Sequence, residues 1–425
     1  MKKLFCLIGL CITFIGVTAQ KTFIYCGQLV DVKNQQMLKE MTIVTDGAKI
    51  VRVDKGYTKA AESDKIIDLK KSTVMPGLID MHVHMESETG PANYLNGFTW
   101  NAGDYAFQSV VFAQKTLMSG FTSVRDLGGS GVNISLRNAI NKEWIIGPRV
   151  YTAGKSLATT GGHADPTNNY RKDLMGDPGP KEGVVNGVED CAKAVRQRYK
   201  EGSDLIKITA TGGVLSMAKD GSGAQFTEEE IKAIVSTAKD YGFKVAAHAH
   251  GAEGMKRAVM AGVNSIEHGT YMSEEVMDLM KQKGTYLVPT IIAGKSSADS
   301  AKKPGYYPEI VKAKALVVGN FIQATFAKAY QRGVKIAFGT DAGVYAHGKN
   351  WIEFVYMTEA GMPILEAIKT ATVNAADLIG DDRLGSIEKD KLADIIAVDG
   401  DPVKDITSMG RVIFVMKNGV VYKGN

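Results

Sequence analysis

Short apolar runs separated by turn signals occupy both ends of the chain. Near the N-terminus they cover residues 23–25, 41–44, 50–53 and 66–69, with Asp46-Gly47 as a turn between two of them. The same pattern returns at residues 393–398, 411–416 and 420–422, where Asn418-Gly419 is typical of a hairpin turn. We predict that residues 20–76 and 385–425 pair into one small β-sandwich.

Between Leu78 and Gly385, strand-like apolar runs alternate with helical patterns. One helical stretch, from Thr227 to Tyr241, opens with the capping-box sequence Thr227-Glu228-Glu229-Glu230. There are eight strand-like runs: the one that starts at Leu78, then residues 122–126, 149–152, 205–209, 244–248, 265–268, 286–290 and 335–340. This alternation favours an α/β fold, a (β/α)₈ TIM barrel over residues 77–384. A doubly wound sheet is the competing layout, but no GxGxxG phosphate loop follows a strand.

The first nineteen residues have the pattern of a secretory signal. Lys2 and Lys3 precede an apolar run that reaches Val17, and small residues follow up to Ala19. We expect cleavage after Ala19 and export, to a periplasm or the cell exterior; an uncleaved anchor is the alternative. The run is too short to span a bilayer comfortably. With no second apolar stretch of spanning length expected, the mature protein should have no stable membrane span.

Composition and charge narrow the function classes further. A content of 44% hydrophobic and 23% charged residues excludes disordered and collagen-like chains. The net charge of +5 comes without a basic run, so nucleic-acid binding has no support. Cys6 and Cys11 fall within the signal. Cys26 and Cys191 form no C-x-x-C motif, so we expect neither a disulfide framework nor a nucleophile.

Two histidines stand two residues apart at the end of an apolar run, as His82-Val83-His84. Side chains at i and i+2 of a strand share a face, so both imidazoles would lean into one space. Two neutral imidazoles in that arrangement form half of a divalent-metal site. The alternative is that they are merely hydrogen-bonded histidines of a strand.

Four further polar residues stand at or near predicted strand ends: Lys207, His248, His268 and Asp341. Lys207 lies inside an apolar strand, where an ammonium would be costly unless it is paired or modified. Taken singly, each has an ordinary explanation, such as a Lys207–Asp204 ion pair, a core histidine or a loop aspartate. Taken together at the carboxyl ends of barrel strands, they predict a metal centre.

These motifs also identify the chain as resembling the amidohydrolase superfamily, in the imidazolonepropionase-like branch that includes secreted prolidase-type dipeptidases. The matching motifs are residues 76–84, 120–126, 204–208, 248–251, 266–269 and 339–341, in family order. The resemblance implies that His82 and His84 bind one metal and that His248 and His268 bind the second. It implies that Lys207 is carbamylated and bridges the two metals, and that Asp341 touches the first metal. Zinc is the default ion for such N/O ligands.

The same resemblance implies a hydrolytic mechanism. A water shared by the two ions attacks the scissile carbonyl as hydroxide, and Asp341 takes its proton and passes it to the leaving amine. His250 is our candidate donor to the oxyanion, although the family often has tyrosine there. His163, in a Gly-rich loop, and Tyr345 are candidate substrate contacts. His347 is a pocket candidate too; solvent exposure is the alternative for Tyr345 and His347.

The function that follows is a secreted binuclear metal-dependent amidohydrolase that cleaves dipeptides or N-acyl amino acids, as prolidases do. The first alternative is a cyclic-amide hydrolase of the imidazolonepropionase type, although histidine breakdown is a cytoplasmic task. The second is a non-catalytic scaffold that keeps the barrel, which the intact ligand set argues against. The expected partner is a small molecule or dipeptide, and an apolar barrel exterior would allow a homo-oligomer. We also expect Arg125 and Asp126 to form a structural pair.

Overall fold

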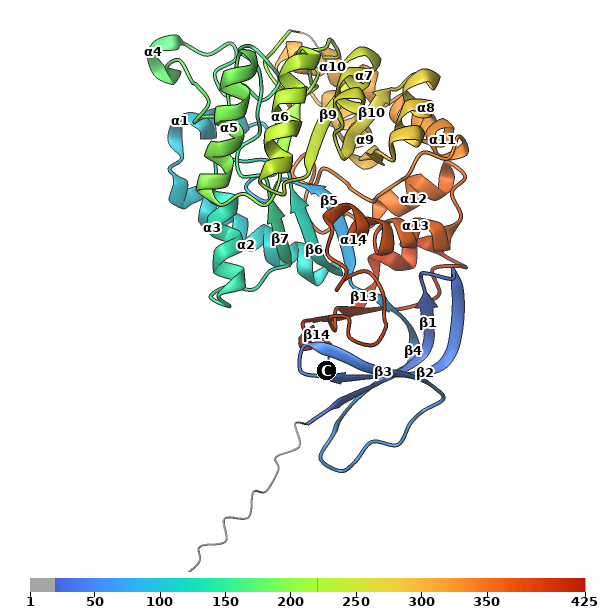
Figure 1. Cartoon of the computed structure of the whole chain (residues 1–425). Coiled ribbons are helices and arrows are strands. Elements are labelled where there is room, and N and C mark those ends of the chain that lie inside the picture. Colours follow the sequence, from blue (N-terminus) through green and yellow to red (C-terminus); the bar gives the residue numbers. More distant parts are fainter. Residues whose placement is uncertain (1–19, 220, 425) are drawn as a thin grey trace, which may run out of the picture.

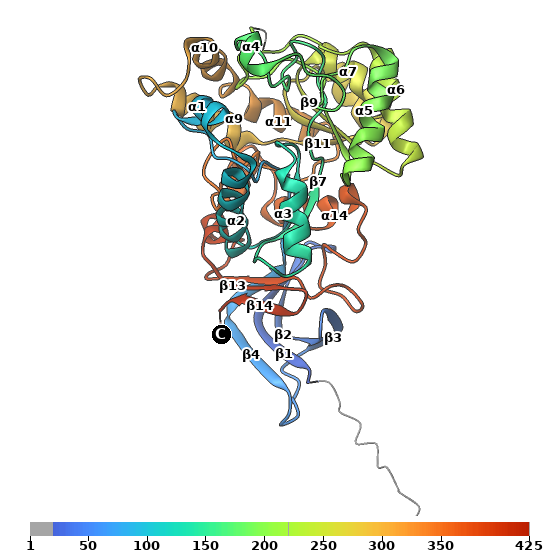
Figure 2. The ribbon, with the colours of Figure 1, turned by 90° about the vertical axis from the view of Figure 1, so that its left-hand side faces the viewer.

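The computed structural model describes residues 20–219 and 221–424, so the signal sequence expected over residues 1–19 lies outside the described residues. Figures 1 and 2 show two adjoining parts, a sheet built from both ends of the chain and a larger part in which helices surround parallel strands. Strand β4 of the first part ends at Pro76 and strand β5 of the second begins at Leu78. The parallel strands therefore start beside the first part and point their carboxyl ends away from it.

The chain ends meet in one seven-stranded sheet with the order β14-β13-β12-β4-β1-β2-β3. Its strands are β1 (Thr22–Asp31), β2 (Gln36–Asp46), β3 (Lys49–Lys55), β4 (Lys65–Pro76), β12 (Ile395–Val398), β13 (Val412–Lys417) and β14 (Val420–Lys423). The N-terminal and C-terminal segments join where β12 runs antiparallel to β4. Asn418 and Gly419 both have positive φ, 51° and 75°, as a tight hairpin turn between β13 and β14 requires. The predicted pairing of the two ends and the hairpin are thus present.

The strands of this sheet pack around an apolar core of their own. Ile24, Ile43, Ile67 and Phe414, from four different strands, belong to one buried apolar cluster. Lys49, at the start of β3, also forms a bridge with Leu392, just before β12. Strands that are far apart in the sheet order therefore contact the same apolar core. In addition, β3 contacts the segment just before β12.

The parallel strands form a three-stranded and a four-stranded sheet. The first has the order β5-β6-β7 and the second β11-β10-β9-β8. Their bounds are β5 (Leu78–Val83), β6 (Phe121–Asp126), β7 (Arg149–Thr152), β8 (Ile206–Thr209), β9 (Val245–Gly251), β10 (Ser265–Tyr271) and β11 (Tyr286–Val288). Every neighbouring pair within them is parallel, as the α/β prediction requires.

Backbone contacts link the two parallel sheets on both sides. Leu157, after β7, bridges to Ile208 of β8. On the other side, Ile336 bridges to Leu287 of β11, and Ala342 bridges to Val83 of β5. Residues 335–340, the eighth predicted strand, thus make isolated bridges rather than a continuous ladder. The chain turns sharply just beyond them, at Asp341, where φ is 58°.

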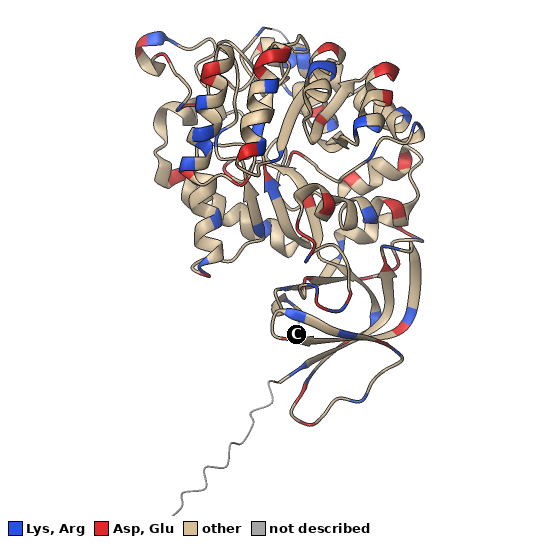
Figure 3. Cartoon of the chain, in the orientation of Figure 1, with Lys and Arg blue, Asp and Glu red and all other residues tan. Residues whose placement is uncertain are grey.

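Helices cover the outer side of these strands (Figures 1 and 2). They are α1 (Asn93–Thr99), α2 (Ala102–Met118), α3 (Val132–Asn141), α4 (Lys172–Met175), α5 (Gly187–Glu201), α6 (Glu228–Asp240), α7 (Ala252–Ala261), α8 (Glu274–Lys283), α9 (Ile291–Ala301), α10 (Glu309–Val318), α11 (Ile322–Gln331), α12 (Ile352–Glu359), α13 (Ile364–Thr370) and α14 (Val373–Ile379), with a short 3₁₀ helix, Ile406–Gly410. The capping box predicted at Thr227 and Glu230 begins α6. Figure 3 shows Lys and Arg interspersed with Asp and Glu over the outer helices, as on a solvated surface.

Cys26 and Cys191 are both buried and free. Burial raises the pKa of each thiol to about 12, which makes both poor nucleophiles. The prediction that they form no disulfide with each other is confirmed.

One stretch differs from what the sequence led us to expect. Residues Glu309–Gln331 are long enough and, with a mean hydropathy of 1.2, apolar enough to pass a composition test for a membrane span. Our prediction that no second stretch of this kind exists was therefore wrong on length and composition. Within this stretch the structure has two helices, α10 and α11, each of ten residues.

Candidate metal centre

The carboxyl ends of strands β5, β9 and β10 bring four of the predicted histidines close together. The ring of His82 lies 5.4 Å from that of His84 and 5.0 Å from that of His268. The ring of His268 in turn lies 4.6 Å from that of His248. Residues separated by more than 180 positions in the sequence thus share one small volume.

Asp341 and Lys207 complete the side of this volume nearest to β5. Asp341 Oδ1 lies 3.3 Å from His84 Nε2 and 3.5 Å from His82 Nε2, and Lys207 Nζ lies 3.4 Å from His82 Nε2. His82, His268 and Asp341 each offer a ligand atom within 4.8 Å of the others. The structure thus brings together all six residues predicted as metal ligands.

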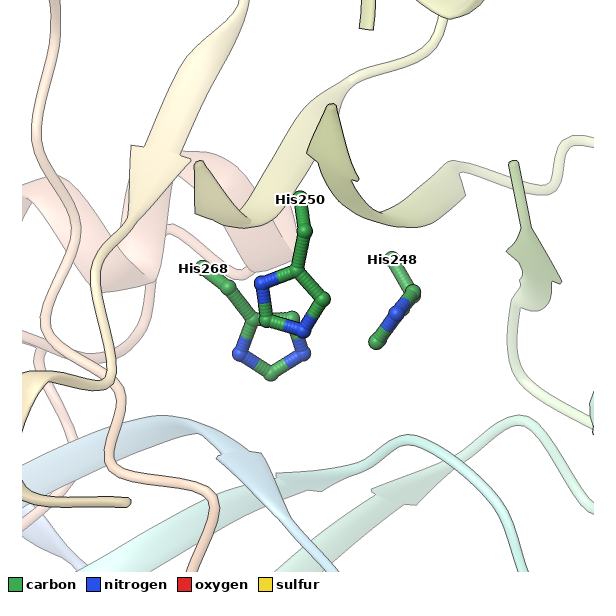
Figure 4. A group of neighbouring side chains, drawn as sticks. All are labelled: His248, His250 and His268. Atoms are coloured by element: carbon green, nitrogen blue, oxygen red, sulfur yellow. The ribbon is translucent and has the colours of Figure 1, made fainter. Parts of the chain in front are cut away.

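A second group of ligand atoms consists of His248, His250 and His268, drawn in Figure 4. The rings of His250 and His268 stack with centroids 4.9 Å apart. We expected only His248 and His268 to be ligands here, with His250 as a donor to the substrate, but the structure groups all three. His248 also stacks on His163 at 4.3 Å, and its Nε2 lies 3.1 Å from the Gly212 carbonyl oxygen.

Hydrogen bonds at Nδ1 orient three of these rings. The Nδ1 atoms of His84, His250 and His268 lie 2.7, 2.8 and 2.7 Å from the Gly128 carbonyl, the Thr270 hydroxyl and the Thr290 hydroxyl, respectively. His84 must donate its Nδ1 proton to the Gly128 carbonyl, which keeps its Nε2 for a metal, whereas a Thr hydroxyl can donate or accept and so allows either tautomer of His250 and His268. The backbone near these contacts is strained, since His268, Thr290 and Asp341 all have positive φ, of 71°, 51° and 58°.

Sequence reasoning missed Glu267, which supports the ring of His82. Glu267 is fully buried; its Oε2 lies 3.0 Å from His82 Nδ1, and its Oε1 accepts from Arg125 Nη2 at 2.8 Å. The expected pair of Arg125 and Asp126 is therefore wrong: neighbouring residues of a strand point to opposite faces. Asp126 instead accepts from the backbone N–H of Met85 at 2.9 Å.

The alternative explanation of Lys207 is also wrong. Asp204, its proposed partner, forms an ion pair with Arg137 at 2.7 Å. Lys207 points the other way, into the site, and only 3% of its surface is exposed. Burial lowers the pKa of its ammonium to about 8, so an appreciable fraction is uncharged near neutral pH.

Burial also keeps four of the site histidines neutral, whereas at His84 burial is outweighed by the hydrogen bond and charge of Asp341, which raise its pKa. Burial lowers the pKa of His82 and His250 to about 4, and those of His248 and His268 well below the ordinary value. Neutral imidazoles offer lone pairs to a cation, which imidazolium ions cannot do.

A cavity of about 260 Å³ opens over these groups. Its polar lining includes the candidate ligands and His163, the loop histidine expected to contact substrate. Its apolar lining consists of Leu127, Val214, Leu215, Ala164, Ala293, Val318, Ile322 and Val344.

The structure does not bring the two candidates after Asp341 to this cavity. Tyr345 packs within the main apolar core and is not part of the cavity lining, where its neighbour Val344 stands instead. His347 is 5% exposed and stacks on Phe112, with ring centroids 4.7 Å apart. Both side chains are buried rather than solvent-exposed, so neither of our two readings of them fits.

The residues present fit divalent cations. Within the described part of the chain, Asp341 Oδ1 is buried without a well-aligned hydrogen-bond donor. Such an orphaned acceptor is costly unless another group neutralises it. Neutral imidazoles and a carboxylate are ligands that suit zinc and similar ions. His82, His84 and Asp341 would hold one ion, and His248 and His268 a second.

Comparison with known proteins shows the family to which the chain belongs. Residues 73–422 match the amidohydrolase family. A solved structure of a Xaa-Pro dipeptidase with methionine bound in the active site is 53% identical, with a TM-score of 0.93 over 95% of this chain and 100% of that one. Ochratoxinase of Aspergillus niger is 32% identical over 96% of this chain and 87% of its own length. Imidazolonepropionase of Thermoanaerobacter pseudethanolicus is 25% identical, covering 88% of this chain and 87% of its own. The chain therefore belongs to the amidohydrolase family, and its α/β fold is that of amidohydrolase structures.

Proposed function

We propose that this protein is a secreted binuclear metal-dependent hydrolase that cleaves the amide bond of dipeptides or N-acyl amino acids. The observation that carries the proposal is the convergence of buried histidines, Lys207 and Asp341 on one cavity. The 53% identity to a Xaa-Pro dipeptidase structure supports the choice of substrate class.

The proposal also covers the fold of the chain and the cellular location of the protein. We infer that the parallel strands and residues 335–340 form a (β/α)₈ barrel over residues 77–384, and that residues 20–76 and 385–425 form a β-sandwich beside it. The bridges of Leu157 and Ile336 between the two parallel sheets support the barrel. Residues 1–19 would be a signal peptide that directs export, on the pattern of their sequence.

Lys207 would be carbamylated in the active protein. Its neutral amine adds to carbon dioxide and releases one proton, which leaves an anionic carbamate. This change replaces a buried cation by oxygen ligands that can bridge two ions, and so removes the cost of burying an ammonium. A pair of divalent cations such as zinc, when bound, supplies Lewis acidity and makes a nearby water more acidic.

The side chains supply the rest of the reaction. Asp341, whose buried Oδ1 has no well-aligned donor, would take a proton from the attacking water and pass it to the leaving amine. His250, whose Nδ1 is held by Thr270, presents Nε2 to the cavity and would donate to the carbonyl oxygen of the substrate. His163 would contact the substrate from its loop.

The residues of the cavity wall narrow the class of substrate further. Among the described residues that line it, Lys207 is the single Lys or Arg. Apart from the candidate ligands and His163, the wall consists of apolar residues, two glycines and the hydroxyl side chains of Ser87, Thr89, Ser156, Thr209 and Ser297. A charged side chain would lose its hydration there without gaining a partner. We therefore expect substrates with apolar side chains to be preferred over acidic or basic ones.

A substrate panel with metal-loaded and metal-free protein tests the proposal. It should contain Xaa-Pro, Xaa-hydrophobic and Xaa-basic dipeptides, N-acyl amino acids and ochratoxin, with metal content measured in parallel. We expect turnover of apolar dipeptides or N-acyl amino acids by protein that carries two metals per chain. Turnover of none of them would refute the proposal.

The cyclic-amide hydrolase remains the second candidate, since imidazolonepropionase matches most of the chain. Imidazolonepropionate belongs in the same panel. Its hydrolysis at a higher kcat/KM than any dipeptide would reverse the order of the two candidates.

A further inference from the structure

We propose that Glu267, held by Arg125, is the positioning residue that fixes the tautomer and orientation of His82 for metal binding. The inference rests on the proposed metal centre but not on any particular substrate. Glu267 is not among the residues that line the cavity, so its role is exerted through His82.

The contacts define the direction of every proton in this group. Glu267 Oε2 lies 3.0 Å from His82 Nδ1, and Oε1 accepts from Arg125 Nη2 at 2.8 Å and from Ser265 Oγ at 2.5 Å. Arg125 also donates from Nε to the Met81 carbonyl oxygen at 2.7 Å. Met81 is the residue before His82, so the guanidinium secures both the carboxylate and the strand that carries the ligand.

An ionised carboxylate can only accept, so the proton of neutral His82 must sit on Nδ1. Nε2 is then left with its lone pair, and this atom faces Asp341 and Lys207 at 3.5 and 3.4 Å. Without Glu267, His82 could instead carry its proton on Nε2 and donate it toward the Asp341 carboxylate. In that tautomer the nitrogen has no lone pair for a metal.

The hydrogen-bond partner at Nδ1 distinguishes His82 from the other histidines of the site. His84, His250 and His268 use a carbonyl or a hydroxyl at Nδ1, whereas His82 alone among the described site histidines has a carboxylate there. A charged partner orients an imidazole more strongly and raises its basicity as a ligand.

Stability alone gives a weak reason for such a pair. A buried ion pair often contributes no more than well-packed apolar residues would. The chain offers a matched comparison in Arg149 and Asp394, another largely buried ion pair, with a distance of 2.7 Å. That pair joins the start of β7 to the residue just before β12, and it contacts no candidate ligand.

The test compares Glu267→Gln with Asp394→Asn by equilibrium dialysis of the zinc-loaded protein against graded chelator, with bound zinc counted by elemental analysis. We expect Glu267→Gln to lose one of its two ions at about 10- to 100-fold lower chelator concentration than the wild type. Asp394→Asn should release zinc as the wild type does, even if its unfolding midpoint falls. Equal zinc retention by Glu267→Gln and Asp394→Asn would overturn the proposal.

A second measurement needs no variant of Glu267, which protects the test if Glu267→Gln does not fold. Nitrogen-15-labelled histidine in the metal-free wild type reports which ring nitrogen carries the proton, with His82 assigned by its absence in His82→Gln. We expect the proton on Nδ1, and finding it on Nε2 would contradict the proposal. Failure of the wild type to bind any metal would refute the proposed function. The tautomer of His82 in the metal-free protein would still show whether Glu267 places the proton on Nδ1.

Discussion

Thr340 is joined to Asp80 by two hydrogen bonds, from its backbone N–H to Oδ1 at 3.1 Å and from its hydroxyl to Oδ2 at 2.6 Å. Asp80 Oδ1 also accepts from the backbone N–H of His82 at 3.0 Å. The carboxyl group of Asp80 therefore connects the segment that carries Asp341 to the strand that carries His82. The distance between two candidate ligands depends on this buried group.

We predict that Asp80→Ala lowers stability and metal content together. The variant leaves the His82 and Thr340 N–H groups, the Thr340 hydroxyl and the Asn350 amide without their acceptor. Each orphaned buried donor costs about 1–3 kcal/mol, so the loss should exceed about 3 kcal/mol. Chemical denaturation and elemental analysis measure both effects. Asp299→Ala, at an exposed carboxylate, is the control; a change as small in Asp80→Ala as in this control would contradict the prediction.

Replacing Lys207 should lower both the metal content and the activity. In Lys207→Ala the proposed carbamate cannot form, so we expect loss of at least one metal and of activity. Lys244→Ala is the matched control, since this half-buried lysine bonds only to the carbonyl oxygens of Asp377 and Leu378. Elemental analysis should find normal metal content in that control. Full activity in Lys207→Ala would refute the assigned role.

Carbamate formation on the metal-free protein should rise with pH. Burial lowers the pKa of Lys207 to about 8, and only the uncharged amine reacts with carbon dioxide. At constant dissolved carbon dioxide, the initial rate should increase about tenfold per pH unit below this pKa and level off above it. Carbon-13 NMR with labelled bicarbonate measures the product directly, and Lys207→Ala supplies the blank. A rate independent of pH would count against the buried amine as the reacting group.

The apolar wall of the cavity should control substrate preference. Ile322 is 2% exposed and lines the cavity, whereas Val317, nearby on the preceding helix, is 48% exposed and does not. Ile322→Ala should raise KM for substrates with apolar side chains about 10-fold with little change in kcat, because it removes ground-state and transition-state contacts alike. Steady-state kinetics of Ile322→Ala and Val317→Ala separate the two positions. Unchanged KM in Ile322→Ala would place the substrate elsewhere.

His347 should make the metal-free protein sensitive to acid. Burial lowers its pKa from 6.5 to about 4, so the folded protein keeps it neutral while the unfolded chain takes up a proton. Relative to His347→Gln, the wild type should therefore lose stability as the pH falls from 6.5 to 4, by up to about 1.4 kcal/mol per pH unit. Above pH 6.5 the difference should be constant. Urea denaturation at a series of pH values measures it, and parallel curves throughout would show that His347 is accessible to solvent.

The candidate ligands could be predicted from the sequence because each is out of place in its own strand. Lys207 interrupts an apolar run, and His82 and His84 share one face of a strand end by their spacing. Barrel geometry then requires that residues at the carboxyl ends of different strands meet. This reasoning needs only the order of the strands, not their exact positions.

Partners across strands could not be predicted in the same way. Arg125 and Glu267 stand in strands whose relative rotation is set by tertiary packing, so sequence proximity pointed to Asp126 instead. The signal was nevertheless present, since an arginine and a glutamate inside two apolar strands each need an opposite charge. The predictions for Tyr345 and His347 were wrong for a related reason. Closeness to Asp341 in sequence does not determine which way a loop side chain turns.

The position of β12 between β4 and β13 has a consequence for biosynthesis. Residues 395–398 pair with residues 73–76, so β4 keeps an unpaired edge until residues 395–398 have left the ribosome. A nascent chain, or one truncated before Ile395, would expose that edge as a template for aggregation. The seven-stranded sheet is thus built from strands far apart in the chain, and non-local pairing of this kind is intrinsically slow to form.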